Sequence, residues 1–577
     1  MEMATVGVLL DKRTAERRWT YGLNAFEFYI EEILSHEGIS YRLFDDIDQL
    51  TESCDIAIAA LAADNAETAS RLWTFMEKGG TVISYAGLNA MASRLGCVWT
   101  GNSGAGYAIT GSDFGEEIPI RFLNAQPWRN GSTCEWPIEE SGTIMKDHPN
   151  GPVIGTARHT FKIGKGVLVR WAVDIIGTII AMQQGSKPVL TDGIPAYDGT
   201  GPVNEGILKA DDQVEMDWDK DRLYTETGAP YYAHPYADYW RKELIGHLLR
   251  VSVDKGMTLP FIGYWPDGVR HVAMISHDSD GNQDEHAETT LEFLRECGIL
   301  STWCIIEPGY SRHIYDRVKD AGHELAFHFN ALDSQGGQWD EAEFNRQLSW
   351  LKDAADLKEV VSNKNHYTRF EGWGELFAWC EKAGILSDQT RGPSKKGNVG
   401  FLFGTCHPFF PIAWSNEKNR IYNVLEIGFL TQDLDLASHW ADSSIVNPFL
   451  DRVRHTEGVA HFLFHQVHIH NHESVRKALR KVIDEARKQD YVFWTGKQVN
   501  DWTRVRRKLG LVSITKQDEI KISGRLEAQG AVALIPVPDS YEEQKDEQVE
   551  VHFGVKCKKQ IIQYLTSYIS GGGAINV

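Results

Sequence analysis

The stretch His271-Val-Ala-Met-Ile-Ser-His-Asp-Ser-Asp-Gly281 decides how the rest of this chain is organised. The apolar run at residues 272–275 predicts a short buried strand, which leads into two carboxylates, Asp278 and Asp280, two residues apart. Enzymes with alternating strands and helices usually keep their chemistry where a core strand ends. Two acids there can divide the work, one holding a metal ion and the other serving as a base. They could equally open a loop and cap the helix that begins near Glu285.

Strand and helix patterns alternate from this stretch onward. Apolar runs predict strands at 272–276, 301–306, 324–328, 359–363, 422–427, 459–465 and 491–494. Helical spacing predicts helices at 285–297, 311–321, 340–355, 373–383, 474–489 and 496–508. This alternation predicts a distorted (β/α) barrel of parallel strands over residues 269–510.

The remainder of the 577 residues is too long for one core and predicts further domains. Residues 1–185 alternate strands (5–10, 41–44, 56–60, 81–85) with helices (25–37, 66–78, 89–95), which predicts a doubly wound, flavodoxin-like α/β domain. The β-forming residues between 110 and 180 could add a small sheet to it. Residues 186–268 are rich in Pro, Gly and Asp up to residue 240 and predict a connector that ends with a helix at 239–255. Residues 511–577 predict a small β-rich domain with strands at 531–535 and 548–553.

Composition narrows the possible partners. Lys+Arg of 59 against Asp+Glu of 80 gives a net charge of −21, which repels nucleic acid and anionic membranes, so we expect neither as a partner. The sequence shows no signal-peptide pattern and no apolar run of membrane-spanning length, so we expect a cytoplasmic protein. Eight cysteines without C-x-x-C spacing predict buried free thiols, not a disulfide framework or a zinc knuckle.

Polar residues follow several of the predicted barrel strands. After Asp278 and Asp280 come His328, His366 and His465, each behind a later strand, and a barrel would bring them to one mouth. Two imidazoles with one carboxylate form a common ligand set for a catalytic divalent metal. The remaining acid and histidine would then be free for proton transfer. A single histidine, however, is more often a hydrogen-bonded structural residue than a ligand.

Four segments resemble the polysaccharide deacetylase family, carbohydrate esterase family 4: "AMISHDSDG", "TLEFLRECGILSTWCI", "VKDAGHELAFH" and "HFLFHQVH". The resemblance covers residues 270 to about 505 and implies a barrel whose divalent metal, which we expect to be zinc, activates water against an N-acetyl carbonyl. Carried over to this chain, Asp278 is the base, Asp280 and His328 are metal ligands, and His465 is the general acid.

The chain departs from the family pattern at two positions. Ser279 separates two aspartates that are adjacent in the usual motif, and Leu332 stands where the family has a second ligand histidine. We expect His366 to replace that ligand, with Asn330 and Asp333 as alternatives.

The sequence also offers residues that could orient the base or contact the substrate. The family's third motif supplies an arginine that orients the base, a role that Arg369 or Arg391 could fill. We expect Arg369, His468 and Trp373 to contact substrate. For tryptophans near the strand ends, packing in the core is the alternative to stacking on a sugar. In the run from His461 to His472, strand alternation predicts that His461 and His465 share one face and that His468 lies on the other.

The amino-terminal region has its own resemblance. "YGLNAFEFYIEEILSHEGISYRLFD" and "EKGGTVISYAGLNAMASRLG" resemble the class I glutamine amidotransferase-like domain of some glycosidases. Catalytic members carry a Gly-x-Cys-x-Gly elbow, which residues 1–185 lack. We therefore expect a non-catalytic scaffold or interaction surface, through which the chain could form a homo-oligomer.

Three functions follow from these patterns. The first is a metal-dependent hydrolase that removes an acetyl group from an N-acylated carbohydrate. The second is a carbohydrate-binding or assembly protein that has kept the barrel and lost turnover. The third is a hydrolase of another non-peptide amide bond.

Overall fold

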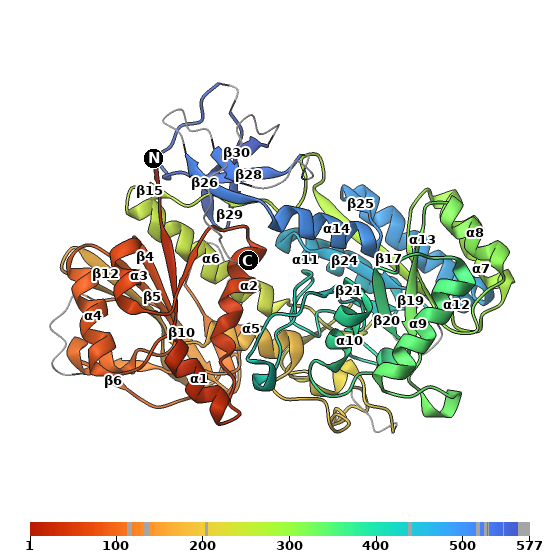
Figure 1. The fold of residues 1–577 in the computed structure, drawn as a ribbon, viewed down its shortest axis with the longest axis horizontal. Helices are drawn as coiled ribbons and strands as arrows, with labels where there is room; N and C mark the ends of the chain where they lie inside the picture. The colour runs from red at the N-terminus through yellow and green to blue at the C-terminus, as the bar shows by residue number, and fades with distance from the viewer. Residues whose placement is uncertain are drawn as a thin grey trace.

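The computed structural model describes residues 1–111, 118–131, 138–201, 206–436, 441–514, 520–523, 528, 530–545 and 547–562. The protein is a mixed α/β molecule in which two large sheets lie side by side, with a smaller β-rich part above them (Figure 1). The first large sheet comes from residues 6–171 and the second from residues 271–493.

The first sheet is half parallel and half antiparallel. Its parallel strands, in sheet order, are β3 (Arg42–Phe44), β2 (Val6–Leu10), β4 (Ile56–Leu61), β5 (Thr81–Tyr85) and β12 (Gly166–Trp171). The antiparallel strands continue from β12 as β11 (Val153–Ile163), β10 (Ile138–Lys146), β7 (Gly106–Ile109) and β8 (Ile120–Phe122). The strands expected between residues 110 and 180 therefore extend the first sheet and do not form a small sheet of their own.

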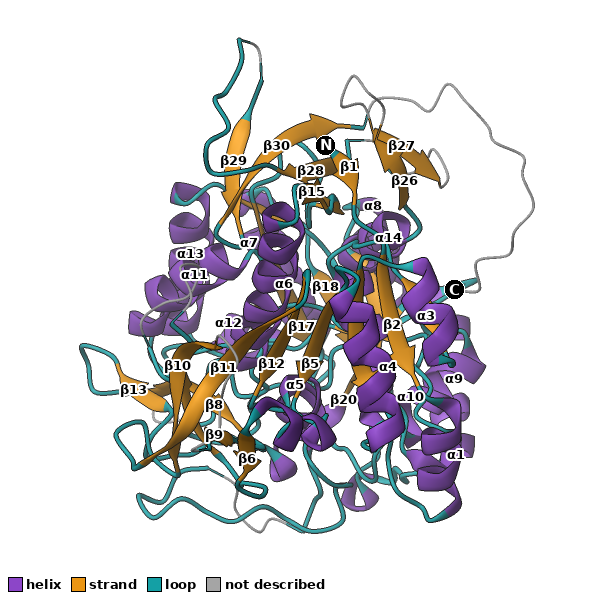
Figure 2. Cartoon of the chain, turned by 90° about the vertical axis from the view of Figure 1, so that its left-hand side faces the viewer, coloured by secondary structure: helices purple, strands orange, loops and turns teal. Residues whose placement is uncertain are grey.

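Helices cover both faces of this sheet, as a doubly wound arrangement requires (Figure 2). Alternate residues of β4 show this: Ile56 and Ile58 pack in one apolar cluster, whereas Ala57 and Ala59 pack in another. One face carries α2 (Ile30–His36) and α5 (Ile175–Gln184), and the other carries α3 (Ile47–Ser53) and α4 (Ala66–Glu77).

Two helical segments differ from the sequence-based expectation. The helix expected at 89–95 is a pair of 3₁₀ turns, Asn89–Met91 and Ser93–Leu95, in which the Ala92 amide donates to the Asn89 carbonyl and the Gly96 amide donates to the Ser93 carbonyl. Helix α1 (Lys12–Thr20) was not predicted because it buries only Ala15 and shows no apolar stripe.

The connector lies against the second sheet and contains little regular structure in its first part. A 3₁₀ turn, Ala210–Gln213, and a hairpin of β13 (Arg222–Tyr224) and β14 (Pro230–Tyr232) precede α6 (Tyr236–Asp254). Helix α6 begins three residues before the expected start and is buried on most of its circumference. A helix that is buried all round lies inside the protein, and α6 lies between the first sheet and the rest of the chain (Figure 1).

The second sheet is parallel and curled. Its strands run in the order β22 (Leu425–Glu426), β21 (Ser387–Asp388), β20 (Ser362–Asn365), β19 (Glu324–Phe329), β18 (Thr302–Ile305), β17 (His271–Asp278), β24 (Val459–Leu463) and β23 (Thr431–Gln432), and β25 (Tyr491–Phe493) also pairs with β17. Only residues 427–430 separate the two edge strands, β22 and β23, in the chain. Five residue steps cover at most about 18 Å, so the sheet must curl to bring its edges together.

Most of the expected barrel elements are present. The helices are α7 (Asp284–Cys297), α8 (Arg312–Asp320), α9 (Glu341–Ala355), α10 (Glu375–Ala383), α13 (Glu473–Lys488) and α14 (Gly496–Arg507). The strand expected at 359–363 lies at Ser362–Asn365, and the sequence did not predict β21, β23, α11 (Val446–Thr456) or α12 (Gln466–Asn471). The distorted barrel predicted for this region is confirmed in part, as a curled parallel sheet.

The β-rich end of the chain pairs with strands from the connector. Strand β28 (Val532–Pro536) lies between β16 (Phe261–Ile262) and β30 (Val555–Ile561), and β29 (Val549–His552) completes that sheet. A separate pair is formed by β26 (Gly510–Ile514) and β27 (Ile520–Ser523). Residues 563–577, the last part of the predicted β-rich domain, lie outside the described residues.

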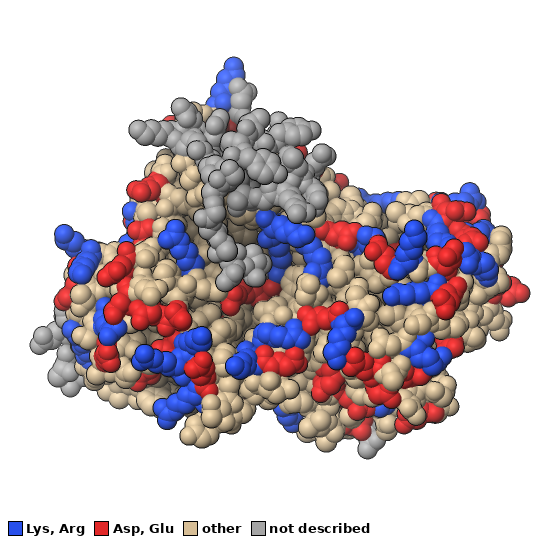
Figure 3. All heavy atoms as spheres, viewed as in Figure 1, with Lys and Arg blue, Asp and Glu red and all other residues tan. Residues whose placement is uncertain are grey.

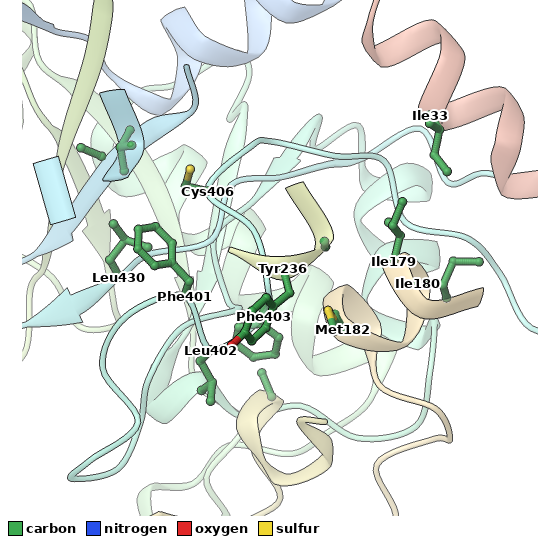
Figure 4. Packing of buried hydrophobic residues seen from close by; sticks show 14 of the residues in the cluster. Ile33, Ile179, Ile180, Met182, Tyr236, Phe401, Leu402, Phe403, Cys406 and Leu430 are labelled. Atoms are coloured by element: carbon green, nitrogen blue, oxygen red, sulfur yellow. The ribbon is translucent and has the colours of Figure 1, made fainter. Parts of the chain in front are cut away.

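One apolar core joins the two halves. Figure 4 shows Phe403, from the second half, beside Met182 of α5 and Tyr236 of α6. The amide of Ala237 donates to the carbonyl of Gly404 at 2.8 Å in the same region.

The surface is charged and mixed. Figure 3 shows acidic and basic side chains interspersed over the part of this face that the structure describes. None of the helices in the described part of the chain combines the length and apolar character needed to cross a membrane.

His552 gives the β-rich part a pH-dependent attachment. It lies 3.7 Å from Glu457 and 3.2 Å from Glu550, and these carboxylates outweigh burial and raise the pKa of His552 to about 9. Because this pKa exceeds the unfolded value of about 6.5, the stabilisation is complete below that pH and is lost as the pH rises through about 9.

We expect His552→Gln to lower the free energy of unfolding by about 1–2 kcal/mol at pH 6 and by little above pH 10, measured by urea denaturation. The exposed His455→Gln is the control; equal effects at both pH values would contradict the prediction.

Candidate metal centre and catalytic site

The predicted site residues converge at the carboxyl ends of four parallel strands. Asp278 ends β17, His328 lies near the end of β19, His366 follows β20 directly, and His465 lies two residues beyond β24. The carboxyl ends of parallel strands meet at one edge of a curled sheet, where polar side chains can gather.

Ser279 explains how two aspartates separated by a residue share this site. Its side chain is fully buried and its hydroxyl oxygen accepts a hydrogen bond of 3.0 Å from the amide of Ile306, while its own amide donates to the carbonyl of Cys304 at 3.1 Å. Successive side chains of an extended segment point in opposite directions. Ser279 therefore anchors the segment to the end of β18, and Asp278 and Asp280 both face the site.

Asp280, His328 and His366 bring three potential ligand atoms together. The distances are 3.6 Å from His328 Nε2 to Asp280 Oδ1, 3.5 Å from His366 Nδ1 to Asp280 Oδ1, and 3.3 Å between the two ring nitrogens. Ligands at 2.0–2.2 Å from a tetrahedral ion lie about 3.3–3.6 Å from one another. The triangle therefore has the size that a zinc-like ion requires.

The hydrogen-bond partners and charges of these three residues also favour the binding of a cation. The Nδ1 hydrogen of His328 is donated to the carbonyl oxygen of Lys364 at 2.9 Å, which leaves the Nε2 lone pair facing Asp280. Burial lowers the pKa of His366 to about 4, so its ring is neutral near pH 7. Oδ1 of Asp280 is buried and has no hydrogen-bond partner among the described residues. His366 lies in this group and Asp333 does not, and the replacement of the missing second histidine by His366 stays a prediction.

Asp278 lies beside this triangle and is paired with a buried lysine. Its Oδ2 is 3.6 Å from His328 Nε2, and its Oδ1 is 3.3 Å from Lys364 Nζ. Burial acts to raise the pKa of Asp278, but Lys364, His328 and His465 outweigh it and hold that pKa below the usual aspartate value. Asp278 is therefore a carboxylate near pH 7 and can accept a proton.

The cation beside Asp278 is Lys364 and neither of the two expected arginines. Arg369 forms an ion pair with Glu371, and Arg391 is buried with its guanidinium 4.8 Å from the centre of the Phe370 ring. The expectation that one of these arginines orients the base is corrected, because Lys364 on β20 already fills the space next to the carboxylate.

His465 is held by an aspartate that the sequence did not reveal. Its Nδ1 lies 2.5 Å from Asp433 Oδ2, and its Nε2 lies 3.7 Å from Asp280 Oδ2 and 3.9 Å from Asp278 Oδ2. Burial acts to lower the pKa of His465, but Asp433, followed by Asp280 and Asp278, raises it to about 10. The ring is therefore a protonated acid near pH 7.

The expected strand alternation around His465 is wrong. Strand β24 ends at Leu463 and α12 begins at Gln466, so His465 is the residue before a helix. His461 lies inside the sheet, where its Nε2 is 2.8 Å from the hydroxyl of Ser276. His468, on α12, is next to His465 with ring centres 5.6 Å apart.

Trp373 has a packing role. It is 4% exposed, its Nε1 donates to the carbonyl of Ile412 at 2.7 Å, and its ring stacks on Phe26 and packs against Trp414. Because its ring is covered by these neighbours, the expectation that Trp373 contacts substrate is corrected.

Lys364 and Asp433 are the site residues that the sequence did not reveal. Lys364 lies in β20, a buried strand of four polar residues that carries no apolar signal, and Asp433 follows the two-residue strand β23. The one available signal was the segment Asn363-Lys-Asn-His366, in which a lysine precedes the histidine ligand by two residues.

Comparisons with known proteins give remote structural likenesses. No family model and no curated protein matches this chain. The solved structures similar to it include a protein assigned as a polysaccharide deacetylase from Mycobacterium smegmatis, 16% identical over 42% of this chain and 93% of its own, with a TM-score of 0.33. The Xyl-CE4 domain of a multidomain xylanase from the hindgut metagenome of Trinervitermes trinervoides is 13% identical over 41% and 92%, with a TM-score of 0.25.

A pseudoenzyme of carbohydrate esterase family 4 from Bacillus anthracis is 12% identical over 41% of this chain and 66% of its own, with a TM-score of 0.24. The low-identity neighbours thus include polysaccharide deacetylases and an inactive relative. The resemblance of residues 1–185 to a glutamine amidotransferase-like domain stays a prediction.

Removal of His366 tests the ligand triangle. We expect His366→Ala to weaken zinc binding at least about 100-fold, because a two-residue site remains, measured by titration calorimetry with a competing chelator. His470→Ala removes a histidine that contacts Thr289 and His286 and should leave the affinity unchanged. Unaltered affinity in the His366 variant would exclude this residue as a ligand.

Proposed function

We propose that this protein is a divalent-metal-dependent hydrolase that removes the acetyl group from an N-acetylated carbohydrate. The proposal rests on Asp280, His328 and His366, whose three potential ligand atoms have the spacing of ligands around a tetrahedral ion. One carboxylate and one protonated imidazole lie next to them. The metal, which we propose to be zinc, would be held by these three residues. When bound, such an ion makes a water molecule more acidic and polarises an amide oxygen.

Asp278 is the proposed general base. It is ionised near pH 7, and its second oxygen faces His328 while its first faces Lys364. The ammonium of Lys364 also donates to the hydroxyl of Ser276 at 2.7 Å, so its position is fixed from two sides. Held in this way, Asp278 can take the proton from a water molecule as that water attacks the amide carbon.

His465 is the proposed general acid. Asp433 accepts a hydrogen bond from Nδ1, so the Nε2 hydrogen points toward Asp278 and Asp280, where the substrate amide would lie. An amine that leaves without a proton is a poor leaving group, so a proton from Nε2 lowers the barrier to C–N bond cleavage. The base and the acid are thus held in opposite protonation states by different neighbours, Lys364 and Asp433.

The four sequence segments that resemble polysaccharide deacetylases support the choice of a carbohydrate amide. A panel of N-acetylated oligosaccharides and simple amides, with acetate release measured on the zinc-loaded protein, tests this choice. Release from oligosaccharides supports the proposal, and release from simple amides alone favours a hydrolase of another C–N bond. Oligosaccharide binding without release in the presence of zinc favours a binding protein.

The base is tested by Asp278→Asn, which removes the proton acceptor and keeps the side-chain shape. We expect kcat for acetate release to fall by about 10²- to 10⁴-fold while zinc affinity stays within a few-fold of the wild-type value. Asp284→Asn changes a nearby carboxylate that accepts from the Ser311 amide and lies outside the ligand group. Activity of the Asp278 variant near the wild-type level would rule out this role.

The acid is tested by Asp433→Asn. The neutral amide no longer favours the imidazolium form of His465, so we expect kcat to fall by about 10²- to 10⁴-fold with zinc affinity retained. Single-turnover kinetics of acetate release would measure the effect on the chemical step. An unchanged rate constant would show that Asp433 does not act through His465.

A further inference from the structure

The third ligand lies on a turn whose backbone is unfavourable. His366 opens a short turn, His366–Thr368, in which Tyr367 has φ of 57° and Thr368 has φ of 51°. Aromatic and β-branched residues rarely adopt this left-handed region, and such conformations persist only where surrounding contacts determine them. Tyr367 is 50% exposed, so burial of its own side chain does not hold the turn.

The contacts that hold the turn come partly from outside the barrel. On the barrel side, the Asn365 amide donates to the hydroxyl of Thr390 at 3.1 Å and the Asn365 side chain donates to the Arg369 carbonyl at 2.8 Å. On the connector side, the amide of Phe370 donates to the carbonyl of Leu208 at 3.0 Å, next to an antiparallel bridge between Lys209 and Arg369.

A second bridge lies further along the same segment. Val189 and Gly372 exchange two backbone hydrogen bonds, of 2.8 and 2.9 Å. Residues 189 and 208–212, which we call the strap, are thus joined to the segment that follows His366 by two isolated antiparallel bridges.

Buried charges fix the strap to the barrel. Asp212 accepts hydrogen bonds from the amides of Lys209 at 2.7 Å and Gly193 at 3.1 Å, and it forms an ion pair of 2.5 Å with Lys395. Asp211 accepts from the Ser394 amide at 2.9 Å and from the Asn398 side chain at 3.0 Å.

Asp211, Asp212 and Lys395 are each at most 5% exposed. A buried charge that loses its partner is strongly destabilising, so these groups hold the strap in one place.

We propose that the strap, although it lies outside the barrel, positions the metal ligand His366 and thereby completes the centre. Lys395 contacts Asp212, and Asp212 contacts Lys209. Lys209 and its neighbour Leu208 pair with Arg369 and Phe370, which follow the turn of His366. Asp212 is a positioning residue in this scheme, because it touches neither metal nor substrate. The inference rests on the metal site of the proposed function, and its test uses zinc binding, with no need for activity.

The test compares zinc affinities of full-length variants by calorimetry with a competing chelator. We expect Asp212→Ala to bind zinc about 10- to 100-fold more weakly than wild type, the range found when residues that orient metal ligands are removed. Asp212→Asn keeps an oxygen that can accept from the Lys209 amide but loses the ion pair with Lys395, so we expect an affinity between those of wild type and Asp212→Ala. Asp198→Ala is the matched control, because Asp198 also lies in the connector but, among the described residues, its side chain bonds to Thr200 and Arg222 and not to the strap.

Hydrogen exchange on the wild-type protein tests the same coupling without a substitution, and it decides the question if Asp212→Ala does not fold. Because coupling between sites is reciprocal, zinc should slow exchange of the Phe370, Gly372 and Val189 amides as well as those of the turn. Equal zinc affinity in wild type and Asp212→Ala would overturn this inference and not the proposed function. Slowed exchange confined to residues 366–368 would have the same meaning. A wild-type protein that binds no zinc would overturn the proposed function together with it.

Discussion

Three carboxylates gathered at the end of a parallel sheet are the constraint on which the site depends. Asp278, Asp280 and Asp433 are all within reach of His465, and removing such charges from water is costly unless opposite charges compensate them. Lys364 compensates Asp278 and the His465 imidazolium compensates Asp433. The remaining negative charge lies on Asp280, whose inner oxygen faces two imidazole nitrogens. A divalent cation held by Asp280, His328 and His366, as proposed above, would supply the positive charge that compensates Asp280.

The backbone makes this concentration of charge possible. The link of four residues between β22 and β23 forces the sheet to curl, so strands that are far apart in sheet order deliver side chains to one place. Ser279 then sets the direction of two aspartates from one strand end. The site therefore follows from the path of the main chain, and few of its residues depend on long flexible side chains for their position.

The sequence predicts the parts of this structure that carry apolar signals. Strands β17, β19 and β24 were predicted because each has a run of buried apolar residues, and Asp278, Asp280, His328 and His465 follow from their places behind those strands. Strand β20 has the sequence Ser-Asn-Lys-Asn, which contains no apolar residue. The predicted strand therefore began three residues too early, and Lys364 was not recognised as a buried cation. Asp433 was not recognised because the two-residue strand before it is too short to show an apolar pattern. Trp373 was misjudged because a sequence does not reveal whether an aromatic face is covered by distant residues such as Phe26.

The pairing of β16 with β28 has a consequence for how the chain is made. Phe261 lies opposite Leu534, so β16 leaves the ribosome well before the strand with which it pairs. Loop closure over such a separation is slow compared with local folding. The amino-terminal sheet can form while the chain is still growing, whereas β16 stays unpaired until β28 has been made. The strap and the segment after His366 pair with each other and need neither β16 nor β28, so they can form before the β-rich part is complete.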